Sequence, residues 1–382
     1  SRLRDEFENG VNNGSYKSNP DSDILKMGFY LQDEIKFENW EIIAGIRYDA
    51  NNIDAFADEK WYASGSSFLT DRESSVGKPI SKDYSNWTPS IAVIRNVNNN
   101  LNLYGKYARG FRAPSWEDLN SSRISLSPNF SYTTVGNPNL KEETSSNYEL
   151  GLKGRNRNSD FGVSTFLNQY KNFLDKSNTT GNVVFYQVTD PFDVLGATPG
   201  LGKMAVEYQT RNVFDVKIYG IEADYKYHFS KRNKGLSFTA SASYVNGENE
   251  TDNENLDSVN PFTAITNFNY LFPNNKFSLS LTNTYVGVPT PSDSYKNPTN
   301  SRGQSLAQYA YIPDSYITSD LALNYKASER FSADLGIYNI FDTVYYKWSD
   351  IRSNGISGSD DIAYQRYAQP GISVKAGFKW RF

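Results

Sequence analysis

Apolar and polar residues alternate with a period of two along most of the chain. The last stretch, Gly371 to Phe382, has one apolar face with aromatic ends and one face of serine, glycine, lysine and arginine. The same alternation returns at residues 40–48, 236–244, 277–281 and 321–325. Successive side chains of a β-strand point to opposite faces, so this pattern predicts strands with one face in lipid and one in water. The expected fold is all-β, an antiparallel transmembrane β-barrel.

The connections between the predicted strands alternate between short and long. The short ones lie at residues 38–39, 98–100, 155–160, 230–234, 273–276 and 327–330. The long ones lie near residues 50–84, 115–145, 175–203, 246–260, 287–315 and 343–370. Outer-membrane barrels have short periplasmic turns and longer extracellular loops. The alternation therefore favours such a barrel over a soluble β-sandwich and places the long loops outside the cell.

Counting the strands predicts about thirteen, beginning with Met27 to Phe37 and including one long strand from Ala205 to Phe229. The Gly/Asn/Ser-rich stretch Gly10 to Asp23 is predicted to be the tail of an extracellular loop. Bacterial single-chain barrels have an even number of strands. An unpaired edge strand would expose backbone N–H and C=O groups that can pair with another chain. We therefore expect residues 1–382 to be the C-terminal part of a larger barrel.

The composition supports a membrane barrel and excludes several other classes. Aromatic residues make up 15% of the 382 residues, yet the mean hydropathy is −0.63. No apolar run approaches the ~18 residues of a membrane helix. The chain has no cysteine, which excludes disulfides and thiolate metal sites, and its net charge of −4 gives no support for nucleic-acid binding.

Two short motifs carry the most specific signal: Tyr107 to Pro114 (YARGFRAP) and Gly136 to Leu140 (GNPNL). Proline lacks the ladder donor, so Pro114 is predicted to end an ascending strand, and Asn137-Pro138-Asn139 is turn chemistry. Both motifs can therefore clamp a loop or contact a ligand. Arg112 is expected to pair with a neighbouring carboxylate such as Glu117 or Asp118, or to face an anionic ligand.

These motifs resemble the FRAP and NPNL boxes of TonB-dependent outer-membrane receptors. Further similarity lies in FLNQYKNFL (166–174), YGIE (219–222), YNIFD (338–342) and the terminal WRF (380–382), so the resemblance covers nearly the whole chain. It implies a barrel of about 22 strands with an N-terminal plug in its lumen, of which this chain would hold strands 10 to 22 and neither the plug nor the first nine strands. It also implies the bacterial outer membrane as location, the inner-membrane TonB complex as energy source through the plug, and Trp380 and Phe382 as an assembly signal.

Within the family, the chain looks similar to the haem, haemoglobin and transferrin receptor branch. The resemblance implies that the loop between the boxes binds the ligand. The expected ligand-binding residues are Phe111, Arg112, Ala113, Pro114, Trp116, Tyr132, Asn137, Pro138, Asn139 and Leu140. Haem-importing members carry a histidine between the boxes, whereas residues 115–136 hold none. Tyr132 is a candidate axial ligand, since tyrosinate binds haem iron in some proteins. The only histidine, His228, is expected at the periplasmic end of a strand and away from any ligand.

The expected function is energy-coupled uptake of haem, or of haem taken from a secreted or host haemoprotein. A ferric-siderophore receptor, a protein-docking receptor that takes iron or haem from a carrier protein, and a plain porin remain as alternatives. No resident cofactor or metal is expected, because haem or a ferric chelate would be cargo. The acidic run Asp252 to Asp257 is predicted to be a solvated loop rather than a calcium site. No catalytic constellation is present, so the chain is not expected to be an enzyme.

Overall fold

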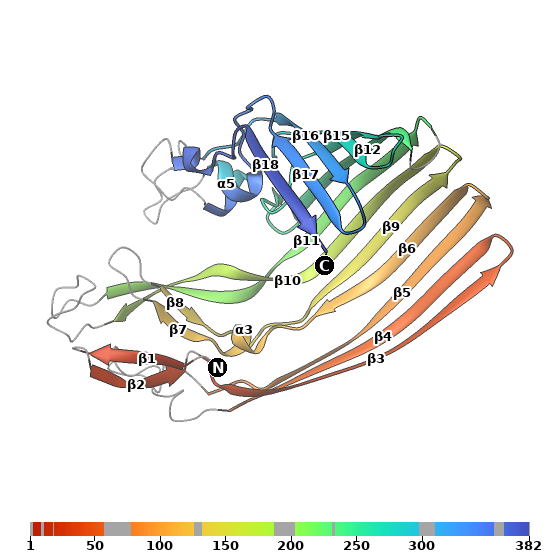
Figure 1. Cartoon of the computed structure of the whole chain (residues 1–382). Helices are drawn as coiled ribbons and strands as arrows, with labels where there is room; N and C mark the ends of the chain where they lie inside the picture. The colour runs from red at the N-terminus through yellow and green to blue at the C-terminus, as the bar shows by residue number, and fades with distance from the viewer. Residues whose placement is uncertain are drawn as a thin grey trace.

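The computed structural model is built mainly of long antiparallel strands (Figure 1). It describes residues 3–8, 11–17, 19–56, 78–125, 132–186, 203–230, 234–297, 310–354 and 363–381. None of the helices in these residues is long and apolar enough to cross a membrane.

A 16-stranded sheet forms the body of the described structure, and its main path is a row of antiparallel strands in which each pairs with the next. The strands of this path in chain order are β3 (Asp21–Phe37), β4 (Trp40–Phe56), β5 (Lys82–Asn98), β6 (Leu101–Arg112), β9 (Glu143–Arg155), β10 (Ser159–Tyr186), β11 (Lys203–His228), β12 (Gly235–Asn249), β14 (Thr263–Leu271), β15 (Phe277–Val286), β16 (Tyr316–Lys326), β17 (Phe331–Tyr338) and β18 (Ser373–Trp380). The path from β18 to β3 contains thirteen strands, which confirms the predicted number. The segment predicted as one long strand, residues 205–229, is indeed a single strand, β11.

Shorter strands and helices lie before or between these strands. They are β1 (Leu3–Glu8), β2 (Val11–Lys17), β7 (Ser122–Ser125), β8 (Tyr132–Val135), β13 (Glu254–Asn255), α3 (Trp116–Asn120), α4 (Asp293–Lys296), α5 (Trp348–Asn354) and η2 (Ala363–Tyr367). The stretch Gly10 to Asp23, predicted to be the tail of an extracellular loop, contains β2, which pairs with β1 in a separate two-stranded sheet, and the start of β3 at Asp21. Polar residues can form strands when a partner strand satisfies their backbone groups.

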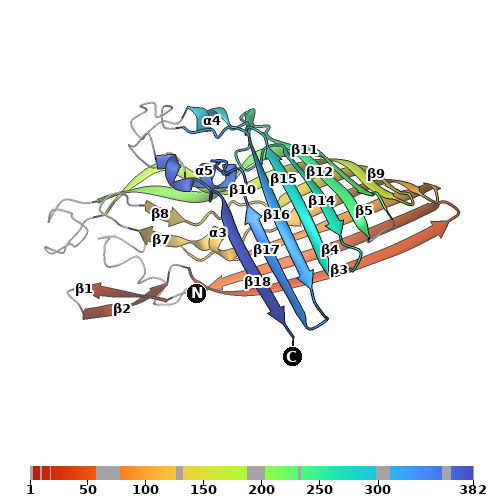
Figure 2. The ribbon, with the colours of Figure 1, turned by 45° about the horizontal axis from the view of Figure 1, so that its top comes forward.

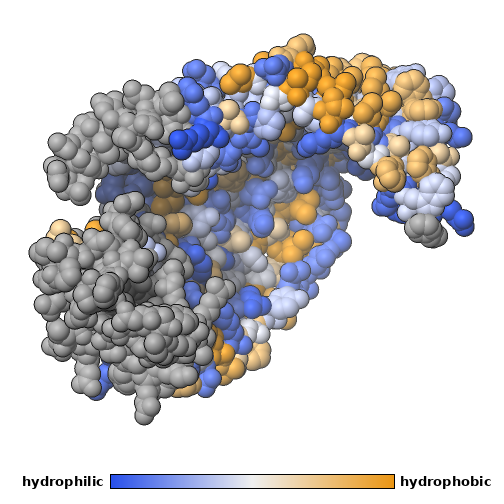
Figure 3. Space-filling model, turned by 60° about the vertical axis from the view of Figure 1, so that its left-hand side comes forward, coloured by the Kyte–Doolittle hydropathy of each residue, from blue (hydrophilic) through white to orange (hydrophobic). Residues whose placement is uncertain are grey.

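The sheet curves around a hollow, with β3 and β18 at its two ends (Figures 1 and 2). Within the described residues, β3 pairs only with β4 and β18 only with β17. Figure 3 shows the concave side lined largely by hydrophilic residues and apolar residues gathered on the outer surface above it. This is the wall of a membrane barrel, with a wet lumen and a lipid-facing outside.

Register explains why the outer face is apolar. Antiparallel partners share a face, so Tyr48 lies opposite Trp87, and Leu281 lies opposite Leu321. The outward side chains are exposed in the described structure: 72% of Leu31 and 82% of Phe378. Apolar side chains at such exposure need lipid around them.

Aromatic pairs form belts at both ends of the apolar band. Near the short turns, the rings of Phe277 and Tyr325 stack at 4.5 Å, and those of Phe331 and Trp380 meet edge-on at 5.6 Å. Near the long loops, Tyr48 and Trp87 lie 4.9 Å apart. Aromatic rings favour both membrane interfaces, which places the short turns and the long loops on opposite sides of the bilayer.

The strands extend further toward the long loops than the sequence predicts. β10 has 28 residues, and it pairs with β11 as far as Tyr186 opposite Lys203. At about 3.3 Å per residue such a strand exceeds the ~30 Å of the hydrocarbon core several-fold. Residues 175–186 of the predicted loop at 175–203 are thus part of a paired hairpin, because each strand satisfies the other's backbone outside the membrane; residues 187–202 lie outside the described part.

Candidate functional site

The candidate site is the connection between β6 and β9, residues 113–142, called here the β6–β9 loop. It holds both sequence boxes at the end where the long loops lie. Its two short strands form a hairpin, and β8 lies parallel to β11, with Tyr132 opposite Val206. The loop is thereby attached to the extended β10–β11 hairpin; residues 126–131 lie outside the described part.

The first box ends β6 and starts α3. Pro114 is fully buried, and the chain turns there into a five-residue helix. Ser115 caps this helix: its hydroxyl accepts from the Asp118 N–H, and the Asp118 carboxylate accepts from the Ser115 N–H at 3.0 Å. This reciprocal capping satisfies donors that the first turn would leave open.

Asp118 also joins the two boxes. Its second carboxylate oxygen accepts from the Thr210 hydroxyl at 3.0 Å, and its carbonyl accepts from the Asn137 N–H at 2.9 Å. The Asn137 amide donates in turn to the Thr210 carbonyl at 2.9 Å. Asp118 is therefore a structural hub between the start of the loop, its end and β11.

The second box is a tight turn whose carbonyls are held by β5. The Asn137 side chain accepts from the Asn139 N–H at 3.0 Å, as expected for the predicted turn. Lys82 donates to the carbonyls of Pro138 and Leu140 at 2.9 and 2.8 Å, and the Tyr84 hydroxyl donates to Leu140 at 3.0 Å.

A small apolar core lies beneath the loop. It consists of Ile53, Tyr84, Leu119, Leu140 and Leu174, with Phe111, Ala113 and Trp116 packed against it. Leu140 has no exposed surface, so its direct role is packing. Burial, and then the nearby negative charges of Glu142 and Asp118, raise the pKa of Tyr84.

Two asparagines attach the loop to neighbouring segments. Each side-chain amide forms hydrogen bonds with both the backbone N–H and the backbone carbonyl of a single residue. Asn120 accepts from the Ile80 N–H at 2.6 Å and donates to the Ile80 carbonyl at 3.0 Å. Asn212 does the same with Lys141, at 2.8 and 2.9 Å. Such side chains imitate a strand partner, which sequence periodicity does not reveal.

Arg112 pairs differently from the expectation. Its guanidinium lies 2.6 Å from the carboxylate of Glu143, its cross-strand partner, and not beside Glu117 or Asp118. Asp118 is engaged by the α3 cap and Thr210, and Glu143 also accepts from the Leu174 N–H at 3.1 Å. The correction follows from register, which places Arg112 and Glu143 directly opposite each other on one face.

The residues of the two boxes differ in what they offer a ligand. Pro138 and Asn139 are exposed, and 53% of the Arg112 side chain is exposed. Trp116 and Tyr132 are half-buried, and the Tyr132 ring meets Tyr208 edge-on at 6.1 Å.

Of the two assembly-signal residues, Trp380 points outward beside Phe331, and Phe382 lies outside the described residues.

No group of histidine, aspartate and glutamate side chains in the described part of the chain is arranged to hold a metal ion. His228 is the last residue of β11, at the short-turn end as predicted, and is buried.

A second set of contacts joins the long loops, and no sequence pattern predicts it. Asp257, predicted to be solvated, accepts from the backbone and hydroxyl of Ser292 at 2.7 and 3.0 Å. Its carbonyl accepts from Trp348 at 2.8 Å and Arg352 at 2.9 Å, and Tyr295 meets the Trp348 ring edge-on. These five residues, the Asp257 cluster, fasten the loops after β12, β15 and β17 together.

Comparison with known proteins agrees with this architecture. Residues 2–340 match the family described as TonB dependent receptor-like, beta-barrel. The match covers most of the 382 residues, so the chain belongs to the TonB-dependent receptor barrel family.

Its relatives include receptors for haem and haemoglobin. Hemoglobin-haptoglobin utilization protein B of Neisseria meningitidis serogroup A is 24% identical over 363 residues, 90% of this chain and 42% of that protein. The Hemin receptor of Yersinia enterocolitica is 26% identical over 369 residues, 92% of this chain and 46% of that protein. The chain thus spans less than half the length of these relatives.

Solved structures share the fold. A mutant of the ferric enterobactin receptor of Pseudomonas aeruginosa matches with a TM-score of 0.64 at 18% identity, over 98% of this chain and 55% of its own. The FrpB iron transporter of Neisseria meningitidis matches with a TM-score of 0.64 at 15% identity, over 96% and 46%.

Proposed function

We propose that this chain is part of an outer-membrane receptor that takes up haem, alone or from a haemoprotein, by energy-coupled transport. The observation that carries the proposal is the β6–β9 loop: two boxes of the haem-receptor type, locked together by Asp118 and buried Leu140, hold a loop at the outer end of the barrel. The names of the curated relatives support haem or haemoglobin as the ligand.

In this proposal the barrel needs further strands to close. The edges of β3 and β18 have no second neighbour in the described sheet, and the matched relatives are more than twice as long. Residues 1–382 would be the C-terminal part of the barrel. Another segment would supply the first nine strands and the plug, through which the TonB complex couples the inner-membrane proton gradient to transport.

The loop would capture the ligand through its accessible residues. Arg112 faces solvent on one side of its pair with Glu143, so it can attract an anionic ligand without losing its partner. Trp116, Pro138 and Asn139 would provide contact surface. Tyr132 would be the candidate axial ligand of haem iron in a loop without histidine. Phe111, Ala113, Pro114, Asn137 and Leu140 would position these groups.

Titration of the purified full-length receptor with haem tests the proposal. Coordination of the haem iron by a protein side chain shifts the Soret band of haem. We expect a saturable shift with one haem per receptor. The Tyr132→Phe variant should bind with a smaller shift, since it lacks the phenolate, while Tyr208→Phe serves as the matched control on the neighbouring ring. The absence of any Soret shift in the wild-type receptor would refute haem binding.

A ferric-siderophore receptor is the second candidate. The absence of histidine from residues 115–136 and the fold shared with a ferric enterobactin receptor favour it. Fluorescence quenching by a ferric catecholate, with no Soret shift by haem, would decide for this function. A receptor that docks a carrier protein would bind haemoglobin but not free haem.

A further inference from the structure

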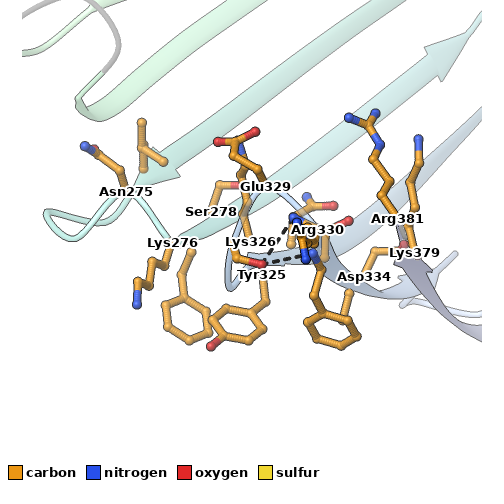
Figure 4. A pocket seen from close by; sticks show the side chains of 17 residues that line it. Asn275, Lys276, Ser278, Tyr325, Lys326, Glu329, Arg330, Asp334, Lys379 and Arg381 are labelled. Atoms are coloured by element: carbon orange, nitrogen blue, oxygen red, sulfur yellow. Dashed lines mark hydrogen bonds and ion pairs between the residues drawn. The ribbon is translucent and has the colours of Figure 1, made fainter.

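A hollow with a strongly cationic lining lies at the short-turn end of the sheet, opposite the candidate site (Figure 4). Its volume is about 440 Å³. The β14–β15 turn, the β16–β17 turn and the last residues of β18 surround it. It is thus built from three segments that the fold brings together at the periplasmic mouth.

The charged residues of this lining are mostly basic. The cations are Lys276, Lys326, Arg330, Lys379 and Arg381, and the carboxylates are Glu329 and Asp334. One ion pair joins residues within this set in the described structure, Lys326 with Glu329 at 2.7 Å. Lys326 and, less strongly, Arg381 lower the pKa of Glu329. The remaining four cations have no ion-pair partner among the described residues.

The hollow lies at the rim of the wall, and part of its lining is on the lumen side. At the end of β18 and directly after it, Lys379 and Arg381 alternate with the outward Phe378 and Trp380, and in Figure 4 both cations rise from the same side of the ribbon as Glu329. On β16, Lys326 follows the outward Tyr325, whose ring stacks on Phe277. Tyr325 and Lys276 point to the other side of the ribbon in Figure 4, where the aromatic belt lies, whereas Lys379 and Arg381 point toward the water-filled interior.

Cations from separate segments repel one another where the fold holds them around one space. The arrangement is favourable when an anion enters, because fixed charges around a concave wall focus their potential on it. Lysine and arginine donate charge-assisted hydrogen bonds to carboxylates in such a setting.

We propose that this hollow is an exit-side binding site for the carboxylate groups of an anionic cargo. The proposal rests on the proposed function: haem carries two propionate carboxylates, and it would meet this wall after it passes the plug. Lys379 on β18 and Arg381 directly after it, with Arg330 on the adjacent turn, bind the carboxylates and hold the cargo at the periplasmic mouth before release.

Isothermal titration of the full-length receptor with benzene-1,3,5-tricarboxylate at low salt tests the site without using haem. The wild-type receptor should bind one tricarboxylate. The double variant Lys379→Gln/Arg381→Gln should bind about tenfold more weakly, equivalent to about 1.4 kcal/mol. Lys375→Gln removes a cation from the same face of β18 outside the hollow, and it should leave the affinity unchanged.

Two outcomes would overturn the proposal. One is no saturable binding to the wild-type receptor, as expected if carboxylates of the protein already fill the hollow. The other is equal weakening by Lys375→Gln, which would indicate an unspecific charge effect. Because the probe contains no iron, a failed Soret titration with normal tricarboxylate binding would reject haem as cargo and leave the anion site standing.

Discussion

At the scale of residues, hydrogen bonds made by a few polar side chains hold the β6–β9 loop in place. Asp118, Asn120 and Asn137 each connect the β6–β9 loop to another segment, and Lys82 holds the turn at Leu140 from β5. Buried polar groups stabilise a structure only when their partners are present. The loop conformation therefore depends on a few side chains that cannot be exchanged for others of similar hydropathy.

Gly136 is the position where the loop approaches α3 most closely. A Cβ atom built there would lie within 3.0 Å of three backbone atoms, two of Leu119 and one of Asn120. Gly136→Ala should lower the free energy of unfolding by about 1–3 kcal/mol and increase hydrogen exchange in residues 113–142. Gly105→Ala is the control, because its nearest neighbour would lie at 3.9 Å. Equal exchange in both variants would contradict the close packing.

The Arg112–Glu143 pair gives a second prediction for single residues. The Glu143 side chain is 10% exposed and that of Arg112 53%, so the pair is partly screened by water. A double-mutant cycle with Arg112→Gln and Glu143→Gln should give a coupling energy of about 0.5–1 kcal/mol in urea unfolding. The same cycle with Glu117→Gln should give none. Coupling to Glu117 instead would restore the pairing that the sequence suggested.

At the scale of elements, the loops after β12, β15 and β17 behave as one unit, because the Asp257 cluster joins them. Tyr295 connects α4 to this unit: its ring meets Trp348 at 5.0 Å between centroids, and its hydroxyl donates to the Tyr311 carbonyl at 3.0 Å. Short helices such as α4 have little stability of their own. Their order depends on these contacts.

The Tyr295 contact predicts a pH dependence of the loops. Burial, and then the negative charge of Asp257, raise the pKa of Tyr295 to about 12, against about 10 for an unfolded tyrosine. The folded state thus favours the protonated phenol, and this stabilisation is complete below about pH 10 and lost as pH rises from about 10 to 12. The loops should open in this window.

Trp348 fluorescence measures that opening, with the Trp348→Phe variant subtracted to remove the other tryptophans. The wild-type signal should change between pH 10 and 12, and Tyr295→Phe, which has no proton to lose, should change less. Identical curves for wild type and Tyr295→Phe would show that this tyrosine does not control the loops.

At the scale of the whole molecule, the sequence predicted the barrel wall well and the loops poorly. Alternation along β4 and β18 reflects the two environments of a barrel strand, so the thirteen strands and the short turns follow from the pattern. The paired extension of β10 and β11 beyond the membrane and the contacts of Asp257 do not. They join residues distant in sequence through backbone groups and register, which leave no periodic trace. The box motifs located the β6–β9 loop, but only the register identified Glu143 as the partner of Arg112.

Uptake of iron-labelled haem by cells that carry the full-length receptor tests energy-coupled haem transport. Haem iron should enter the cells when the inner membrane is energised, and a protonophore should stop the uptake, since transport would draw on the proton gradient through TonB. Gly136→Ala should reduce the uptake and Gly105→Ala should not. Haem uptake that continues unchanged in the presence of the protonophore, or no haem uptake while a ferric siderophore is imported, would refute the proposed function.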